Sequence, residues 1–170
     1  AFAQWTQYLI NRIKLNAGLR YDYFGYIEKK GYVSPRLSAQ INVLHDLYMN
    51  LSYGIFYQSP SYIWLVSNPL NKKLEDIRAE HYIAGLEYIF MPDLKASVEV
   101  YYKNYNKYPV STERPYFILS NNGGNFENQN NFGLEPLVSE GTGYSNGIEF
   151  FVQKAFSKNY YFNVNLSLFR

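Results

Sequence analysis

Apolar and polar side chains alternate along most of this chain, and the alternation stops and restarts several times. From 34 to 43 the odd-numbered residues are apolar and the even-numbered ones polar, and 47–57 largely repeats this after a break at His45 and Asp46. A period of two is typical of β-strands with two different faces. Helical periodicity is weak, and only 69–79 favours a short helical turn. The sequence thus predicts eight strands, at 2–9, 13–24, 34–43, 47–57, 80–90, 94–106, 146–155 and 160–169.

Short and long connections alternate between these strands. Tight turns lie at 10–12, 44–46, 91–93 and 156–159, whereas the connections 25–33, 58–79 and 107–145 are longer. A transmembrane β-barrel has short periplasmic turns and longer extracellular loops, and it must close because every backbone group in lipid has to be paired. We therefore expect an all-β fold in the bacterial outer membrane. It would be an antiparallel up-and-down meander of about eight strands and part of a larger transmembrane β-barrel.

The two faces of the predicted strands differ in charge. Except in 2–9, where Trp5 and Gln7 share a face, the apolar face carries no charge at its middle. A lipid-facing Lys or Arg at mid-depth costs about 2–4 kcal/mol, so we expect the apolar face to contact lipid. The residues predicted to face lipid include Leu15, Ala17, Leu51, Ala84, Val98, Phe150 and Val164. Those predicted to face the lumen, or a plug within it, are Arg20, Arg36, Glu87, Glu99 and Glu149.

Composition narrows the class of protein. Aromatic residues make up 19% of the chain, and such rings suit a boundary between water and an apolar medium, although a soluble sheet can also be rich in them. The net charge of +2 is spread thinly, which gives little support to a nucleic-acid partner. There is no Cys, which excludes disulfides and thiol chemistry. No apolar run approaches the roughly 18 residues of a transmembrane helix.

The position of the chain ends suggests a segment of something longer. The opening "AFAQWTQYLINR" has neither the basic nor the apolar region of a signal peptide. If the tight turns are periplasmic, both ends lie on the extracellular side, so we expect 1–170 to be part of a larger barrel. Two alternatives remain open. One is a complete eight-stranded outer-membrane protein acting as an adhesin, a pore or a small enzyme. The other is a soluble lipocalin-like carrier with its apolar face turned inward.

Four motifs stand out along the chain: "LNAGLRYDYF" (15–24), "SPRLSAQINVLHDLYMNLSYGIFYQSPS" (34–61), "RAEHYIAGLEYIF" (78–90) and "YSNGIEFFVQKAF" (144–156). They resemble motifs in the barrel domain of TonB-dependent outer-membrane receptors, particularly those of Bacteroidetes-type bacteria. They stand in the family's order and spacing, and the resemblance covers nearly the whole chain except residues 107–143. The family usually has Pro-Glu before the third motif, where this chain has Asp76 and Ile77.

The resemblance implies active transport. A plug domain, absent from these residues, would fill the barrel, and the periplasmic TonB protein would pull on that plug. The chain would supply barrel wall and extracellular loops for uptake of a siderophore, oligosaccharide, peptide or vitamin. The implied partners are outer-membrane lipid, the protein's own plug and TonB through that plug, with a surface lipoprotein as a further candidate. The implied protein is not an enzyme and needs no cofactor.

The two longest loops are the best candidates for ligand contact. A loop longer than about 15 residues is usually functional or disordered. Aromatic rings beside an Arg can hold a sugar, a peptide or an aromatic chelator, although the same rings can anchor the loops to each other or to the membrane interface. The candidate ligand-binding residues are Tyr57, Tyr62, Trp64, Arg78, Tyr108, Arg114, Tyr116 and Phe117.

Catalytic and metal chemistry have weaker support. A group formed by Glu75, Asp76, Glu80 and His81 could suggest a metal site, but a charged rim at the start of a strand is the simpler interpretation. Glu87 and Glu99 could face each other across a hairpin, as catalytic carboxylates do. With Lys95 and Lys103 on the same face, a lumen charge network is favoured instead. We predict no catalytic residue and no metal ligand.

Overall fold

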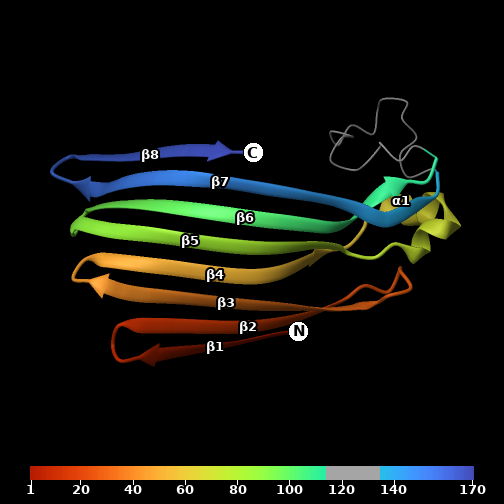
Figure 1. Cartoon of the computed structure of the whole chain (residues 1–170), viewed down its shortest axis with the longest axis horizontal. Coiled ribbons are helices and arrows are strands. Elements are labelled where there is room, and N and C mark those ends of the chain that lie inside the picture. Colours follow the sequence, from red (N-terminus) through yellow and green to blue (C-terminus); the bar gives the residue numbers. More distant parts are fainter. Residues whose placement is uncertain (114–134) are drawn as a thin grey trace.

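The computed structural model describes residues 1–113 and 135–170, and these form one antiparallel sheet. Its eight strands are paired in chain order, with β1 and β8 at the two edges (Figure 1). The predicted meander is therefore confirmed. The strands are β1 (Phe2–Leu9), β2 (Ile13–Tyr23), β3 (Gly31–Leu44), β4 (Leu47–Gln58), β5 (Ile77–Met91), β6 (Leu94–Ser111), β7 (Leu137–Ser157) and β8 (Tyr160–Phe169).

Tight turns join the strands at one end of the sheet, and the longer connections lie at the other (Figure 1). Ile10 and Asn11 have φ values of 53° and 50°, and Lys158 and Asn159 have values of 49° and 66°. Two consecutive residues with positive φ suit a two-residue hairpin turn whose twist matches that of the strands. The predicted alternation of short and long connections therefore places all tight turns at one end of the sheet, which we call the turn end. The longer connections lie at the opposite end, which we call the loop end.

The strand register aligns apolar residues of neighbouring strands in rows across one face of the sheet. Partner residues in an antiparallel sheet lie on the same face, so a row can be followed from strand to strand. One such row consists of Leu15, Ala39, Leu51, Ala84, Val100, Ile148 and Leu168. The next row toward the turn end consists of Ile13, Ile41, Met49, Leu86, Val98, Phe150 and Leu166. We call this side the apolar face and the opposite side the polar face.

Aromatic side chains border the apolar face near both ends. Near the loop end Tyr53, Tyr82 and Tyr102 occupy one row, with ring centroids 5.0 and 6.4 Å apart. Near the turn end the rings of Tyr88 and Phe90 meet edge to face at 4.7 Å. From Tyr82 to Tyr88 the strand advances about 20 Å, at about 3.3 Å per residue. Because strands of an outer-membrane barrel tilt by about 35–45°, this path spans about 15 Å of the apolar band of about 25 Å that lies between the two aromatic girdles.

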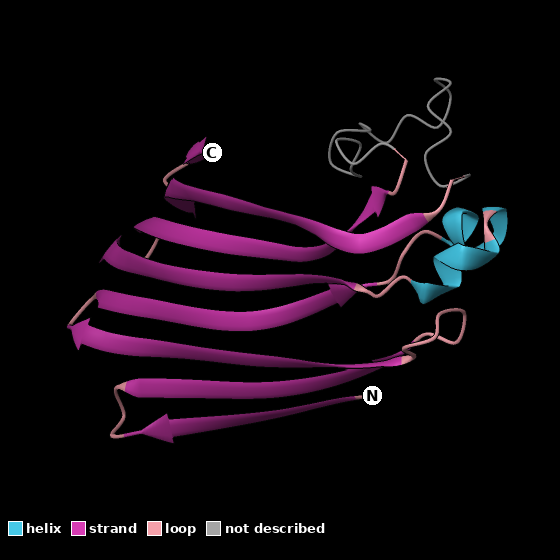
Figure 2. Ribbon diagram, turned by 45° about the vertical axis from the view of Figure 1, so that its right-hand side comes forward, coloured by secondary structure: helices cyan, strands magenta, loops and turns pink. Residues whose placement is uncertain are grey.

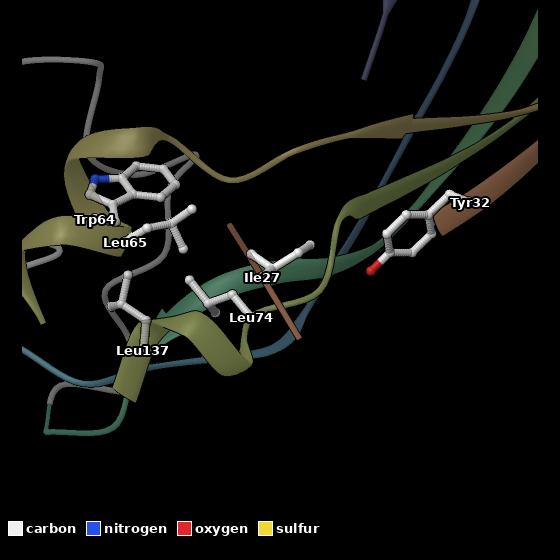
Figure 3. Close-up of a cluster of buried hydrophobic side chains, with 6 residues drawn as sticks. All are labelled: Ile27, Tyr32, Trp64, Leu65, Leu74 and Leu137. Carbon is white, nitrogen blue, oxygen red and sulfur yellow. The ribbon is translucent and has the colours of Figure 1, made fainter. Parts of the chain in front are cut away.

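The buried hydrophobic core lies beyond the sheet, at the loop end. It contains Ile27, Tyr32, Trp64, Leu65, Leu74 and Leu137 (Figure 3). These residues come from the β2–β3 connection, the start of β3, the β4–β5 connection and the start of β7, and Phe24 and Tyr57 pack against them. We call this assembly the cap. Neither face of the sheet needs a protein core of its own if one faces lipid and the other a lumen.

The helical prediction is partly wrong. A 3-10 helix, η1 (Pro69–Lys73), covers the first part of the predicted turn at 69–79, but Ile77 to Ala79 already belong to β5. A short α-helix, α1 (Tyr62–Ser67), precedes it and was not predicted (Figure 2). Within the described ranges no helix is long and apolar enough to cross a membrane.

Several strands extend further toward the loop end than predicted. β3 begins at Gly31, β5 begins at Ile77, β6 continues to Ser111 and β7 begins at Leu137. In this region Ile77, Val110 and Leu137 are all buried, so the extended parts of the strands pack into or beside the cap. The predicted loop 107–145 is therefore shorter, and its residues 114–134 lie outside the described residues.

Candidate functional site

A buried asparagine holds the cap together. The side chain of Asn71 is 0% exposed, and its Nδ2 donates to the carbonyl oxygens of Trp64 at 3.0 Å and Glu135 at 3.4 Å. Its Oδ1 accepts from the backbone N–H of Leu137 at 2.8 Å. One side chain thus satisfies backbone groups of α1, of β7 and of the segment before β7. Because buried polar groups are costly when unpaired, these bonds fix the two loops relative to each other.

Charged side chains tie the same loops together at the surface. Glu75 accepts from Lys29 at 3.0 Å and from Lys107 at 2.8 Å, which links the β2–β3 connection to β6. These hydrogen bonds, that from Lys107 first, hold the pKa of Glu75 below its usual value. The neighbouring Asp76 is only 3% exposed, and burial raises its pKa although Ser59 donates to it at 3.3 Å. The backbone N–H of Asp76 also donates to the phenol oxygen of Tyr32 at 3.0 Å.

The predicted display of aromatic rings on the β4–β5 loop is wrong for one residue. Trp64 is 3% exposed and lies inside the cap core, in one cluster with Leu65, Leu74 and Leu137 (Figure 3). Tyr57 is half-buried in β4, with its ring 4.7 Å from that of Tyr32. Tyr62 is 53% exposed at the start of α1 and remains accessible to a ligand.

Two other candidate ligand residues belong to strands rather than loops. Arg78 lies in β5 and forms an ion pair with Glu80. Tyr108 lies in β6, half-buried, with its ring edge-on to Tyr105 at 5.9 Å. The remaining three candidates, Arg114, Tyr116 and Phe117, lie outside the described residues.

The residues predicted to face the lumen all lie on the polar face. Register pairs Arg20 with Phe2 and Ser34, and it places Arg36 beside Gly18 and Gly54. Arg20 forms an ion pair with Asp22 at 2.8 Å. Glu87 forms one with Lys95 at 3.0 Å, as expected of a charge network on this face.

Arg36 is part of a stack on the polar face. Its guanidinium lies 4.6 Å from the centroid of the Phe56 ring, and this ring lies 4.5 Å from that of His81. Gly54 makes the arrangement possible, since a Cβ there would lie 2.8 Å from the Phe56 ring and 3.6 Å from Arg36 Cγ. A glycine inside a strand often marks such a close approach, and this was the one sequence signal for the stack.

The expectation that Glu87 and Glu99 face each other across the hairpin is wrong, because the strand register does not place them opposite each other. Glu87 lies opposite Ser97, and Glu99 lies opposite Gly85 on one side and Glu149 on the other. Glu99 and Glu149 are half-buried, and neither forms an ion pair with a residue that the structure describes. Like charges directly opposite each other destabilise a sheet, so this pair is an unfavourable contact among the described residues.

The residues considered for a metal site do not converge. Glu75 contacts two lysines, Asp76 contacts Ser59 and Glu80 contacts Arg78, while the His81 ring lies on Phe56. No group of three or more acidic or His side chains in the described parts of the chain could hold a metal ion. The charged-rim interpretation describes these contacts better.

The whole chain, residues 1–170, matches the model of the family described as TonB dependent receptor-like, beta-barrel. The chain therefore belongs to the β-barrel family of TonB-dependent receptors, whose members are integral outer-membrane proteins. This confirms the expected family and location. No curated protein matches the sequence.

Solved structures of receptors share the fold. The siderophore receptor PirA from Pseudomonas aeruginosa has 12% identity and a TM-score of 0.71, over 99% of this chain and 33% of that one. The alcaligin receptor FauA from Bordetella pertussis has 14% identity and a TM-score of 0.68, over 96% and 28%. The FrpB iron transporter from Neisseria meningitidis has 12% identity and a TM-score of 0.67, over 99% and 25%. The chain thus spans a third or less of each relative.

Proposed function

We propose that the chain forms barrel wall and extracellular cap of a receptor that takes up a ligand in a TonB-dependent way. The observation that carries this is the division of the sheet. One face is apolar between two aromatic borders, the other is charged, and an ordered cap stands at the loop end only. Such a wall needs lipid on the apolar face and a polar lumen on the other. Its role is transport rather than catalysis.

The plug domain of the same protein is the proposed partner of the polar face. Glu99 and Glu149 lie opposite each other without a cation among the described residues, so a basic side chain from a plug would neutralise both. A carboxylate pair of this kind gains far more from an Arg or Lys than either carboxylate would alone, because the repulsion is also removed. TonB would then act on the barrel only through this plug.

An iron chelate is the first ligand class to test. The similar structures are described as a siderophore receptor, an alcaligin receptor and an iron transporter. Identities of 12–14% support a shared fold and not a shared ligand. The proposal for this chain is therefore transport, and the ligand has to be identified by experiment. Oligosaccharides, peptides and vitamins form the comparison set.

Uptake assays on the full-length protein test this function. Cells that express it should accumulate one labelled ligand from a panel of iron chelates, oligosaccharides, peptides and vitamins. Deleting TonB should abolish that accumulation and leave binding at the cell surface unchanged. Equal uptake with and without TonB would instead identify a passive pore, and surface binding without any uptake would identify an adhesin.

A further inference from the structure

The polar face contains a hollow whose lining carries positive charge. It measures about 380 Å³ and lies across β1 to β4, and its lining includes Lys14, Asn16, Arg36, Ser38 and Ser52. Register places these side chains on one face, since Asn16, Ser38 and Ser52 form a row and Arg36 and Lys14 lie above and below it. None of the described residues that line the hollow is acidic.

Both cations of the hollow lack a counter-charge. Lys14 and Arg36 are half-buried, and neither forms an ion pair with any described residue. The Nε of Arg36 is buried and donates to no described group. By contrast, Arg20 and Lys95 on the same face each form an ion pair with a neighbouring carboxylate. Each of the two cations of the hollow contacts an aromatic ring, Lys14 that of Tyr8 at 5.8 Å and Arg36 that of Phe56 at 4.6 Å, but neither has a carboxylate partner that the structure describes. A cation that is kept partly out of water without a counter-charge favours binding an anion.

The floor and wall of the hollow are fixed in advance. Thr6 donates to Asn16 at 2.9 Å, and Asn16 donates to Ser38 at 3.1 Å, so a chain of hydrogen bonds crosses three strands. The hydroxyl of Ser38 accepts in this chain, which leaves its own proton to donate into the hollow. The stack on Phe56 holds the guanidinium of Arg36 at the opposite wall. Preorganised donors of this kind cost little ordering when an anion binds.

We propose that this hollow binds the anionic group, a phosphate or a carboxylate, of a small molecule in the lumen. Lys14 and Arg36 would hold the negative charge from two sides, while the Ser38 and Ser52 hydroxyls donate to its oxygens. A volume of about 380 Å³ lies within the range of small-molecule sites and exceeds what one carboxylate side chain of a plug would fill. The inference rests on the proposed transport function and specifies that the transported ligand is an anion.

The probe for this site is phenyl phosphate, with benzyl alcohol as its uncharged counterpart. Both are titrated against the purified full-length protein by calorimetry or saturation-transfer NMR, where no TonB is needed. The wild type should bind phenyl phosphate and not benzyl alcohol. Arg36→Gln and Lys14→Gln should each raise the dissociation constant about tenfold or more, since each removes a charge-assisted hydrogen bond. Arg36→Lys should retain most of the affinity.

The matched control is Lys95→Gln. Lys95 also lies on the polar face, but it is paired with Glu87 and lies outside the hollow, so its loss should leave phenyl phosphate binding unchanged. Equal affinities in the wild type, Arg36→Gln and Lys14→Gln would overturn the proposal. Failure of the wild type to bind phenyl phosphate would overturn it as well. That result is expected if an acidic side chain of the plug occupies the hollow. Binding is measured on the purified protein without TonB. The result of the binding test is therefore independent of whether the uptake assay supports the proposed transport function.

Discussion

At the scale of single residues, two side chains that look alike in sequence have different roles. Trp64 and Tyr62 stand two positions apart in an aromatic loop, yet Trp64 is buried in the cap and Tyr62 is 53% exposed. The difference lies in α1, where only Trp64 belongs to the buried cluster with Leu137. A period-two pattern could not predict a six-residue helix, so it could not separate these two. Tyr62→Ala therefore tests ligand contact, whereas Trp64→Ala would first disturb the cap.

Some residue roles could be predicted and others could not. Alternation alone predicted which residues lie on the polar face, because successive side chains of a strand point to opposite faces. These residues are Arg20, Arg36, Glu87, Glu99 and Glu149. The bonds of Asn71 gave no signal, since they join positions as far apart as Asn71 and Leu137, and no short-range pattern records such contacts.

Glu75 makes the stability of the cap depend on pH. Its pKa is lowered in the folded state, so it contributes stability above the unfolded value of 4.5, and that contribution is lost as pH falls through the folded pKa. Glu75→Gln should weaken the hydrogen-exchange protection of the Leu74 and Leu137 amides at pH 7 by less than about 1 kcal/mol, because both lysines are well solvated. The difference between the two proteins should shrink as pH falls below 4.5, because Glu75 then becomes protonated.

The control for this measurement is Lys30→Gln. Lys30 is exposed beside Lys29 and forms no ion pair with a described residue, so its loss should change protection little at either pH. Burial gives Asp76 a pH dependence of the opposite sign, but Asp76 is present in both proteins and its effect largely cancels. A Glu75→Gln defect that persisted unchanged at pH 3 would contradict the electrostatic explanation.

At the scale of elements, the middle of each strand was predictable and the loop end was not. Lipid and lumen impose an alternation along the middle of a strand, and the residues of β5 from Tyr82 to Tyr88 keep it except for Ile83, which lies on the polar face opposite Ser52. At the loop end the strands pack against the cap, where Pro109, Val110 and Ser111 are buried in succession. Burial on both sides removes the period of two, and β6 and β7 therefore extended beyond their predicted limits.

A charge placed on either face of β6 should separate the two environments. Val98 lies on the apolar face between Leu86 and Phe150, in a row between the two aromatic borders, so Val98→Arg should cost about 2–4 kcal/mol and reduce outer-membrane assembly of the full-length protein. The neighbouring Ser97 lies on the polar face between Glu87 and Phe151. Ser97→Arg should assemble like the wild type, as measured by heat-modifiable migration and surface labelling. Equal defects in both variants would refute the assignment of faces.

At the scale of the whole molecule, a sheet with an exposed apolar face and an unneutralised polar face is stable only with its surroundings. Large apolar side chains such as Leu37, Val100 and Val164 are 56%, 50% and 56% exposed in the described sheet. A contiguous apolar surface of this kind needs lipid. The polar face has the corresponding need for counter-charges, at Glu99 and Glu149 for a cation and at Lys14 and Arg36 for an anion.

The acidic pair therefore offers a test in which the sign depends on the partner. In a barrel without its plug, Glu99→Gln with Glu149→Gln removes a repulsion between directly opposed carboxylates, so it should stabilise the barrel by about 0.2–1 kcal/mol. In the full-length protein the same double variant removes the charges that a basic plug side chain would neutralise. There it should destabilise the protein, because the plug cation is left buried without its partners.

Thermal unfolding of the four proteins measures both effects. The melting temperature of the double variant should exceed that of the wild type without the plug and fall below it in the full-length protein. Greater entry of a large antibiotic into cells with the full-length variant would show that the plug is held less firmly. The pair Gln153→Glu and Asn163→Glu is a useful contrast. These residues oppose each other across β7 and β8, and Lys95 on β6 lies directly opposite Gln153, so here the new charges meet a cation of the barrel itself. A double variant at Glu99 and Glu149 that raised the melting temperature equally in both forms would mean that no plug cation reaches this row.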